Sequence, residues 1–112
     1  MMMRTIRACL LFAAALAWAP AGGQENWPVR PVRVVVPSSP GGGTDIYARL
    51  LAAPLGESLN QQFIIDNRPG GAGNIGTEIV VRAAPDGYTL LVSSSASVII
   101  NPALFRNLPF NV

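Results

Sequence analysis

The stretch at residues 32–45 decides the fold, and it reads VRVVVPSSPGGGTD. Its first five residues are β-branched apart from one arginine, a pattern typical of a strand buried on both faces of a parallel sheet. Pro37 ends this strand, and a loop of serine, proline and glycine follows it. Thr44 or Asp45 is then placed to serve as the N-cap of a helix. The stretch therefore predicts a strand, a small-residue loop and the start of a helix.

The first helix is predicted from apolar residues at helical spacing. They are Ile46, Tyr47, Leu50, Leu51, Leu55 and Leu59. We expect Pro54 to kink or shorten this helix, because proline removes a backbone hydrogen bond and its ring crowds the preceding turn.

The rest of the chain repeats the same unit. A second strand is expected at residues 63–65, a glycine-rich loop at 67–74 and then a second helix that ends before the Pro85-Asp86-Gly87 turn. A third strand at 88–92 leads into a serine loop, and a short apolar segment follows that Asn101-Pro102 interrupts. Strands alternating with helices predict an α/β fold class, a parallel sheet with right-handed crossovers and flanking helices.

Three small-residue loops leave the predicted strands at one edge of the sheet. They span residues 38–45, 67–74 and 93–97. Because ligands of such sheets bind beyond the carboxyl ends of the strands, this convergence predicts a binding site.

The first of these loops suits an anion. Its glycines let backbone N–H groups approach a ligand closely, and it ends at a helix N-terminus, where free N–H groups favour negative charge. Ser39 and Thr44 add hydroxyl donors. A tight strand-to-helix connection that merely needs glycine explains the same residues equally well. Asp45 is either a ligand contact or a favoured charge in the first helical turn, and Arg68 either pairs with a ligand carboxylate or ties its loop to Asp66.

Catalytic, nucleotide and metal sites are disfavoured by missing residue types. The chain has no histidine and no lysine, which excludes a Ser-His-Asp triad and a P-loop. Residues 71–76 match the dinucleotide motif G-x-G-x-x-G, but no acidic residue occurs at 91–96, where a ribose would be held. We therefore expect no enzyme, no cofactor and no metal, with a nucleotide-binding α/β domain as the weakest alternative.

The N-terminal residues are predicted to be a targeting signal. Residues 1–7 are basic, residues 8–19 form an apolar run, and small residues at 19–21 fit a cleavage site. The run is shorter than the about 20 residues that a membrane span needs. We expect residues 1–23 to be a signal peptide, cleaved near residues 21–23, and the mature chain to reach the periplasm.

The predicted signal peptide contains the excess positive charge and the single cysteine of the sequence. Arg4 and Arg7 account for the net charge of +2, so the rest of the chain is neutral and offers no basic patch for a nucleic acid. The single cysteine, Cys9, also lies in the segment. The mature chain therefore has no thiol for a disulfide, a nucleophile or a metal site.

Five blocks of the mature chain are similar, in order, to successive blocks of one protein family. They read WPVRPVR at 27–33, VPSSPGGGTD at 36–45, DNRPGGAGNIG at 66–76, APDGYTL at 84–90 and NPAL at 101–104. By these blocks the chain resembles the Bug family, the periplasmic receptors of tripartite tricarboxylate transporters.

The resemblance implies a type II periplasmic-binding-protein fold that closes two lobes on a small organic carboxylate and passes it to the membrane components of the transporter. It also implies that residues in the loops after the first and third strands contact the ligand. The matching positions here are Ser39, Gly42, Gly43, Thr44 and Asp45, with Ser94 and Ser95 in the third loop. Many relatives have an aromatic residue or alanine before Pro40, whereas this chain has Ser38-Ser39.

The resemblance also sets an expectation about length. Members of the family are much longer, so residues 24–112 are expected to be a partial N-terminal lobe that includes only the first part of lobe 1. The main hypothesis is solute capture, incomplete in this chain. The alternative is a non-functional fragment or a secreted single-lobe module that binds a protein through its sheet edge.

Overall fold

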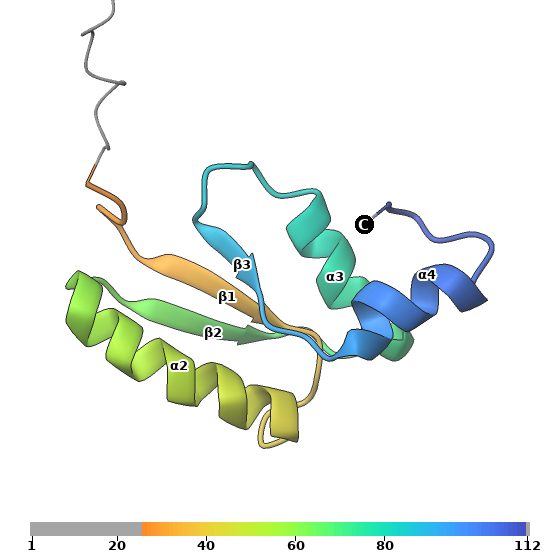
Figure 1. Cartoon of the computed structure of the whole chain (residues 1–112), viewed down its shortest axis with the longest axis horizontal. Coiled ribbons are helices and arrows are strands. Elements are labelled where there is room, and N and C mark those ends of the chain that lie inside the picture. The colour runs from red at the N-terminus through yellow and green to blue at the C-terminus, as the bar shows by residue number, and fades with distance from the viewer. Residues whose placement is uncertain (1–25, 112) are drawn as a thin grey trace, which may run out of the picture.

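The stretch at residues 32–45 forms strand β1 (Val32–Val36) and the first turn of helix α2 (Gly43–Leu59) in the computed structural model, which describes residues 26–111. Strand β2 (Phe63–Asn67), helix α3 (Asn74–Val81) and strand β3 (Thr89–Leu91) follow (Figure 1). A short 3₁₀ turn, η1 (Gly71–Gly73), precedes α3. A π-helical segment, η2 (Ala96–Ile100), and helix α4 (Asn101–Leu104) come last. The predicted signal peptide lies outside the described residues.

The three strands form one parallel sheet in the order β2-β1-β3. Val34 of β1 is aligned with Ile65 of β2 and with Leu90 of β3. Helix α2 packs along β2 and β1, and helix α3 packs along β1 and β3. Because the chain crosses the sheet in opposite directions in its two crossovers, right-handed connections place the two helices on opposite faces (Figure 1). The predicted α/β class and parallel sheet are confirmed.

The core is centred on β1, as its run of valines predicts. Val32, Val35 and Val36 have no exposed surface, and Val34 is nearly as buried. Ala48 of α2 packs against Val34 and Val36. Phe63, Ile65 and Val92 complete this cluster from the sheet.

The structure corrects the predicted N-cap of α2 and one of the two effects expected of Pro54. Helix α2 begins at Gly43, with Gly42 rather than Thr44 or Asp45 at the N-cap. Pro54 does not shorten the helix, which continues to Leu59. Pro54 lies on an exposed side of the helix.

The apolar segment that Asn101-Pro102 interrupts is helical on both sides of this dipeptide. Segment η2 passes directly into α4, and Pro102 lies in the first turn of that helix. A proline is tolerated there because the first N–H groups of a helix have no intrahelical acceptor.

The large apolar side chains of α2 do not form its core-facing side. Asp45 and Ala48 are its buried residues, whereas Tyr47, Leu50 and Leu51 are each more than half exposed. The small side chain of Ala48 lets the helix approach the sheet closely. Within the described residues, most of the surface of Leu50 and Leu51 is therefore left uncovered.

Candidate functional site

The three loops meet at the carboxyl edge of the sheet, as predicted. The amide of Asn67, at the end of β2, donates to the carbonyl of Ser38 in the first loop at 3.1 Å. Gly76 of α3 lies so close to Pro37 that an added Cβ would be 2.7 Å from the proline Cβ. An added Cβ at Gly73 would be 2.9 Å from the Cβ of Ser97 in the third loop. Direct contacts therefore join all three loops.

Asp45 holds the first loop and the end of β2 together. One of its carboxylate oxygens accepts hydrogen bonds from the backbone N–H of Gly41 at 2.8 Å and from Nε of Arg49 at 3.0 Å. The other oxygen accepts from the amide of Asn67 at 3.0 Å. Only 2% of Asp45 is exposed. The carboxylate thus holds the first loop in place through hydrogen bonds from three donors within this chain.

The hydrogen bonds of Asp45 set its protonation. They come from Arg49, then Gly41, then Asn67, and together they lower the pKa of Asp45 from 3.8 to about 2, although burial opposes them. Asp45 is therefore ionised at neutral pH. Because its charge is buried and shared among three donors, it stiffens the loop rather than repelling an approaching anion as a free carboxylate would.

The N-terminus of α2 is open. Gly42 is extended there (φ −72°, ψ 163°), and no side chain caps the helix. The N–H of Ile46 donates to the carbonyl of Gly42 at 3.0 Å, which closes the first turn. The N–H groups of Gly43 and Thr44 precede that turn and have no acceptor within the helix. Gly43 is exposed, and a Cβ added there would meet no atom within 4 Å apart from the adjacent residues and the backbone of its own helix, so a ligand can approach from this side. The arrangement favours an anion.

The serines of the first loop differ in their surroundings. Ser39 is exposed, and its carbonyl accepts from the N–H of Gly42 at 3.2 Å, which forms the turn. The hydroxyl oxygen of Ser38 is buried and has no hydrogen-bond partner among the described residues. Such orphaned groups are uncommon in folded proteins. Ser38 was not among the predicted site residues.

The third loop contributes exposed hydroxyls. Ser94 and Ser95 have exposed side chains just beyond β3. The hydroxyl of Ser93 donates to the carbonyl of Ser94 at 3.1 Å and also contacts the hydroxyl of Ser97. Ser97 is buried against the second loop. Internal contacts therefore engage Ser93 and Ser97, while Ser94 and Ser95 face solvent.

The glycine motif at residues 71–76 is explained by packing. Gly73 lies against Ser97, and Gly76 lies against Pro37 and the carbonyl of Arg68. The carbonyl of Gly73 also accepts from the hydroxyl of Thr77 at 2.9 Å. These close approaches account for glycine at both positions without a nucleotide.

Arg68 forms the internal ion pair that was one of its two predicted roles. Its Nε donates to Asp66 at 2.8 Å, and Arg33 pairs with the same carboxylate. Burial by itself would raise the pKa of Asp66, but the hydrogen bonds from Arg33 and Arg68 outweigh it and hold that pKa below its ordinary value.

Asn67 and Arg49 are site residues that the sequence reasoning did not single out. Arg49 lies four residues after Asp45, the spacing of neighbours on one helix face, and this was an available signal. Asn67 lies 22 residues after Asp45 in the sequence. Its hydrogen bond to Asp45 follows only from the pairing of β2 with β1.

Other candidate sites are weaker. A hollow of about 810 Å³ lies near the far end of α2 and the start of β2, lined by residues such as Ala52, Gly56 and Gln62. It lies at the opposite edge of the sheet from the loops and includes no helix N-terminus. Within residues 26–111, no group of three or more acidic, cysteine or histidine residues is arranged to hold a metal, and no helix is long and apolar enough to cross a membrane.

Comparison with known proteins identifies similar chains. A family model described as "Tripartite tricarboxylate transporter family receptor" matches residues 47–112. Protein BugT of Bordetella pertussis is 39% identical over 112 residues, which is 99% of this chain and 34% of that protein. The chain spans about a third of the length of the curated relatives it matches.

Solved structures agree with the sequence match. A periplasmic transporter aligns with 76% of this chain and 29% of its own length at 40% identity and a TM-score of 0.73. A protein of R. palustris solved with adipate gives 41% identity and a TM-score of 0.72, covering 76% of this chain and 28% of its own. MatC from Rhodopseudomonas palustris, solved with bound malate, gives 41% identity and a TM-score of 0.71. The match covers 76% of this chain and 29% of MatC. The fold of residues 26–111 is thus part of a larger known fold.

Proposed function

This chain belongs to the family of tripartite tricarboxylate transporter receptors, also called the Bug family, and on that premise we propose that it forms one wall of a site that captures a small carboxylate-bearing solute in the periplasm. The family is one of solute-binding receptors, not of enzymes. The membrane components of the transporter would take the solute from the complete receptor. The signal peptide at residues 1–23, with cleavage near 21–23, and the reading of residues 24–112 as a partial lobe belong to the same proposal.

The observation that carries the proposal is the open N-terminus of α2. The free N–H groups of Gly43 and Thr44 lie above a loop that Asp45 holds in place. A carboxylate of the solute accepts hydrogen bonds from these groups, and the helix dipole favours its charge. Because the donors belong to the backbone and the loop is already formed, little ordering is needed when the solute binds.

The remaining site residues have assigned roles in this proposal. Gly42 leaves space for the turn, since an added Cβ would lie 3.3 Å from the carbonyl of Ser39. The hydroxyls of Ser39 and Thr44 donate to the same carboxylate or to a bridging water, and Asp45 positions the loop. Ser94 and Ser95 contact the solute from the third loop. Two similar proteins were solved with dicarboxylates, adipate and malate, which supports this class of solute.

A pair of substitutions at one position tests the proposal. Gly43→Pro removes a single N–H donor at the first helical position, where proline is favoured, and the extended Gly42 before it suits a proline. Gly43→Ala keeps the N–H and adds a methyl group into open space. Both substitutions are made in a fusion, hereafter the joined protein, in which this chain is followed by the part of the adipate-bound relative that lies beyond the matched stretch. The binding of adipate and of malate to each variant is measured by calorimetry.

We expect Gly43→Pro to bind roughly ten- to a hundredfold more weakly than Gly43→Ala, the value of a hydrogen bond to a charged group, because only the proline removes the N–H donor. Equal affinity of the two variants, with both folded by circular dichroism, would contradict the assigned role of the helix N-terminus.

A further inference from the structure

One polar group of the first loop has no hydrogen-bond partner within the part of the chain that the structure describes. It is the hydroxyl oxygen of Ser38, which is buried although the residue as a whole is partly exposed. The backbone of the same residue is engaged, because its carbonyl accepts from the amide of Asn67 at 3.1 Å. A buried hydroxyl without a partner has lost its hydrogen bonds to water and gained none in return. Ser38 thus keeps a donor and an acceptor in reserve.

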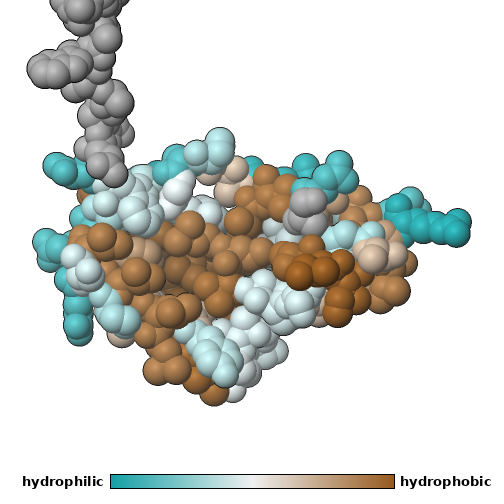
Figure 2. All heavy atoms as spheres, in the orientation of Figure 1, coloured by the Kyte–Doolittle hydropathy of each residue, from teal (hydrophilic) through white to brown (hydrophobic). Residues whose placement is uncertain are grey.

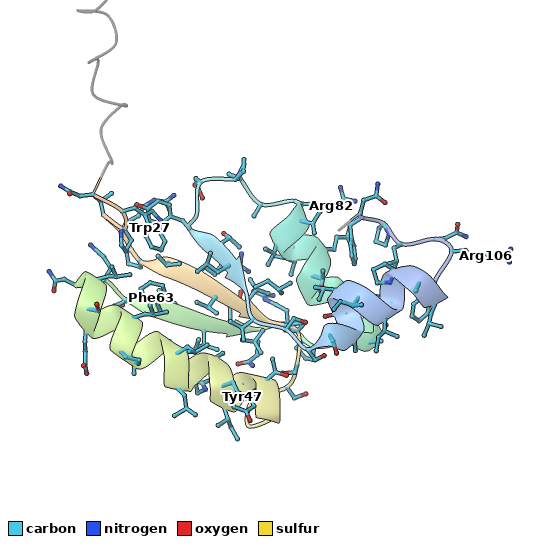
Figure 3. The ribbon with its side chains drawn as sticks, in the orientation of Figure 1. Trp27, Tyr47, Phe63, Arg82 and Arg106 are labelled. Atoms are coloured by element: carbon cyan, nitrogen blue, oxygen red, sulfur yellow. The ribbon has the colours of Figure 1, made fainter. Side chains whose placement is uncertain are left out.

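The hydroxyl of Ser38 lies beside the open N-terminus of α2. A Cβ added at Gly42, the N-cap of the helix, would be 3.9 Å from the Ser38 Oγ. The N–H of Gly43 is the next backbone group along the chain. Figure 2 shows weakly polar residues, drawn pale, at this end of α2, and Figure 3 shows Tyr47 of the first turn directed away from the sheet rather than across the loop. A group attached to a carboxylate that binds at Gly43 is therefore close enough to meet Ser38.

Rotation about one bond presents this hydroxyl to a solute. A serine side chain has three staggered positions about its Cα–Cβ bond, and a partly exposed residue exchanges between them rapidly. The buried position leaves the Oγ without a partner. A position that gives it one is therefore favoured as soon as a ligand supplies a polar group. The change needs no movement of the backbone, which the bond from Asn67 holds in place.

The carbon next to the bound carboxylate is the part of the solute that remains to be recognised. The N–H groups of Gly43 and Thr44 are donors only and suit the carboxylate itself. A 2-hydroxy acid has a hydroxyl on the neighbouring carbon, and this hydroxyl can both donate and accept, as that of serine does. A methylene group there offers no such partner. MatC, a similar protein, was solved with malate, which is a 2-hydroxy acid.

We propose that Ser38 is a specificity-determining residue, whose hydroxyl recognises the 2-hydroxyl group of a 2-hydroxy carboxylate. This inference rests on the proposed function, because the carboxylate bound at the start of α2 places the hydroxyl of the solute. A solute with the hydroxyl gives the Oγ of Ser38 its partner, whereas a solute without it leaves the Oγ as it is in the free chain. A site that hydrogen-bonds a substrate hydroxyl discriminates against the analogue that lacks it for this reason.

Malate and succinate test the proposal, because they differ only in this hydroxyl. Their affinities are measured by calorimetry in a second fusion, in which this chain is followed by the part of MatC that lies beyond the matched stretch. Ser38→Ala removes the hydroxyl of the loop. Ser58→Ala is the matched control, since Ser58 is exposed near the far end of α2.

We expect Ser38→Ala to weaken malate binding roughly tenfold, about the value of one hydrogen bond, and to leave succinate binding unchanged. Ser58→Ala should bind both solutes as the unchanged fusion does. Equal losses for malate and succinate in Ser38→Ala, or no loss for malate, would overturn the inference and leave the carboxylate site in place. If the unchanged fusion binds neither solute, the proposed function fails, and this inference fails with it.

The melting temperature of the chain alone gives an independent readout. Because Ser38→Ala removes a buried hydroxyl that has no partner, the variant should melt at the same temperature as the unchanged chain or higher. A fall of about 5 °C or more would overturn the inference, since the hydroxyl would then already be bonded in the free chain.

Discussion

Helix α2 contributes both to the carboxyl edge of the sheet and, through its leucines, to an exposed apolar surface, and the two regions differ in how completely they are packed. At the carboxyl edge, Asp45 has three hydrogen-bond donors within this chain, and Gly73 and Gly76 are in close contact with neighbouring loops. Leu50 and Leu51, by contrast, have more than half of their surface exposed. The difference teaches that the loop contacts are completed within residues 26–111, whereas the large apolar side chains of α2 are left uncovered there.

The largest expected loss of stability comes from a charge placed in the core. Val36→Asp places an unpaired carboxylate where no surface is exposed, and we expect the chain to lose its cooperative fold. Leu51→Asp places the same group at an exposed position of α2, and we expect the fold of the chain alone to persist. Far-UV circular dichroism during thermal melting distinguishes the two. Similar losses in both variants would show that Leu51 is already buried in this chain.

Close packing at the loops gives the next largest effect. A methyl group at Gly76 would lie 2.7 Å from the Cβ of Pro37 and 2.9 Å from the carbonyl oxygen of Arg68. We expect Gly76→Ala to lower the free energy of unfolding in urea by about 2 kcal/mol, although alanine is the better helix former. Gly43→Ala, which meets no neighbour within 4 Å, should change it little. If the two variants unfold at the same urea concentration, the loops are not packed as described.

The Asp45 carboxylate predicts a dependence on pH. Its pKa is about 2 in the folded chain against 3.8 for an ordinary aspartate, so its stabilising effect is complete above about pH 4 and is lost as the pH falls towards 2. We expect Asp45→Asn to lower the melting temperature at pH 7 by about 5 °C. The variant should also lose less stability than the unchanged chain between pH 4 and pH 2. Parallel pH curves for the two proteins would argue against an ionised, buried Asp45.

The smallest effect is expected at an exposed ion pair. Arg30 and Asp86 are 3.0 Å apart, and both side chains are largely exposed to solvent. We expect Asp86→Asn to change the free energy of unfolding by less than about 0.5 kcal/mol. This variant is the control for Asp45→Asn. A loss as large as that of Asp45→Asn would mean that burial does not distinguish the two carboxylates.

The sequence predicted the order of elements and the edge where the loops meet, because both depend on local patterns. A run of valines, glycine loops and turn dipeptides occur within a few residues of one another and specify strands and connections directly. The likeness to the family, read from short blocks along residues 27–104, is confirmed by the family model.

What the sequence did not predict depends on contacts distant along the chain. The apolar periodicity of α2 suggested that its leucines face the core, but Ala48 is the residue that packs against β1. Apolar residues occur on more than one side of this helix, so their spacing does not indicate which side faces the sheet. The N-cap was missed because Gly42 has no side chain to indicate it, and the bond between Asn67 and Asp45 depends on the pairing of β1 with β2. The signal peptide lies outside the described residues and stays a prediction.

The central claim is that the free N–H groups at the start of α2 form a ready site for a carboxylate. The most direct test is a titration of the ¹⁵N-labelled chain with adipate, followed by NMR of the backbone amides. The account predicts that the signals of Gly43 and Thr44 shift most, and that those of Gln61 and Gln62 at the opposite edge of the sheet stay in place. Shifts confined to Gln61 and Gln62, or none at Gly43 and Thr44 at saturating adipate, would contradict it.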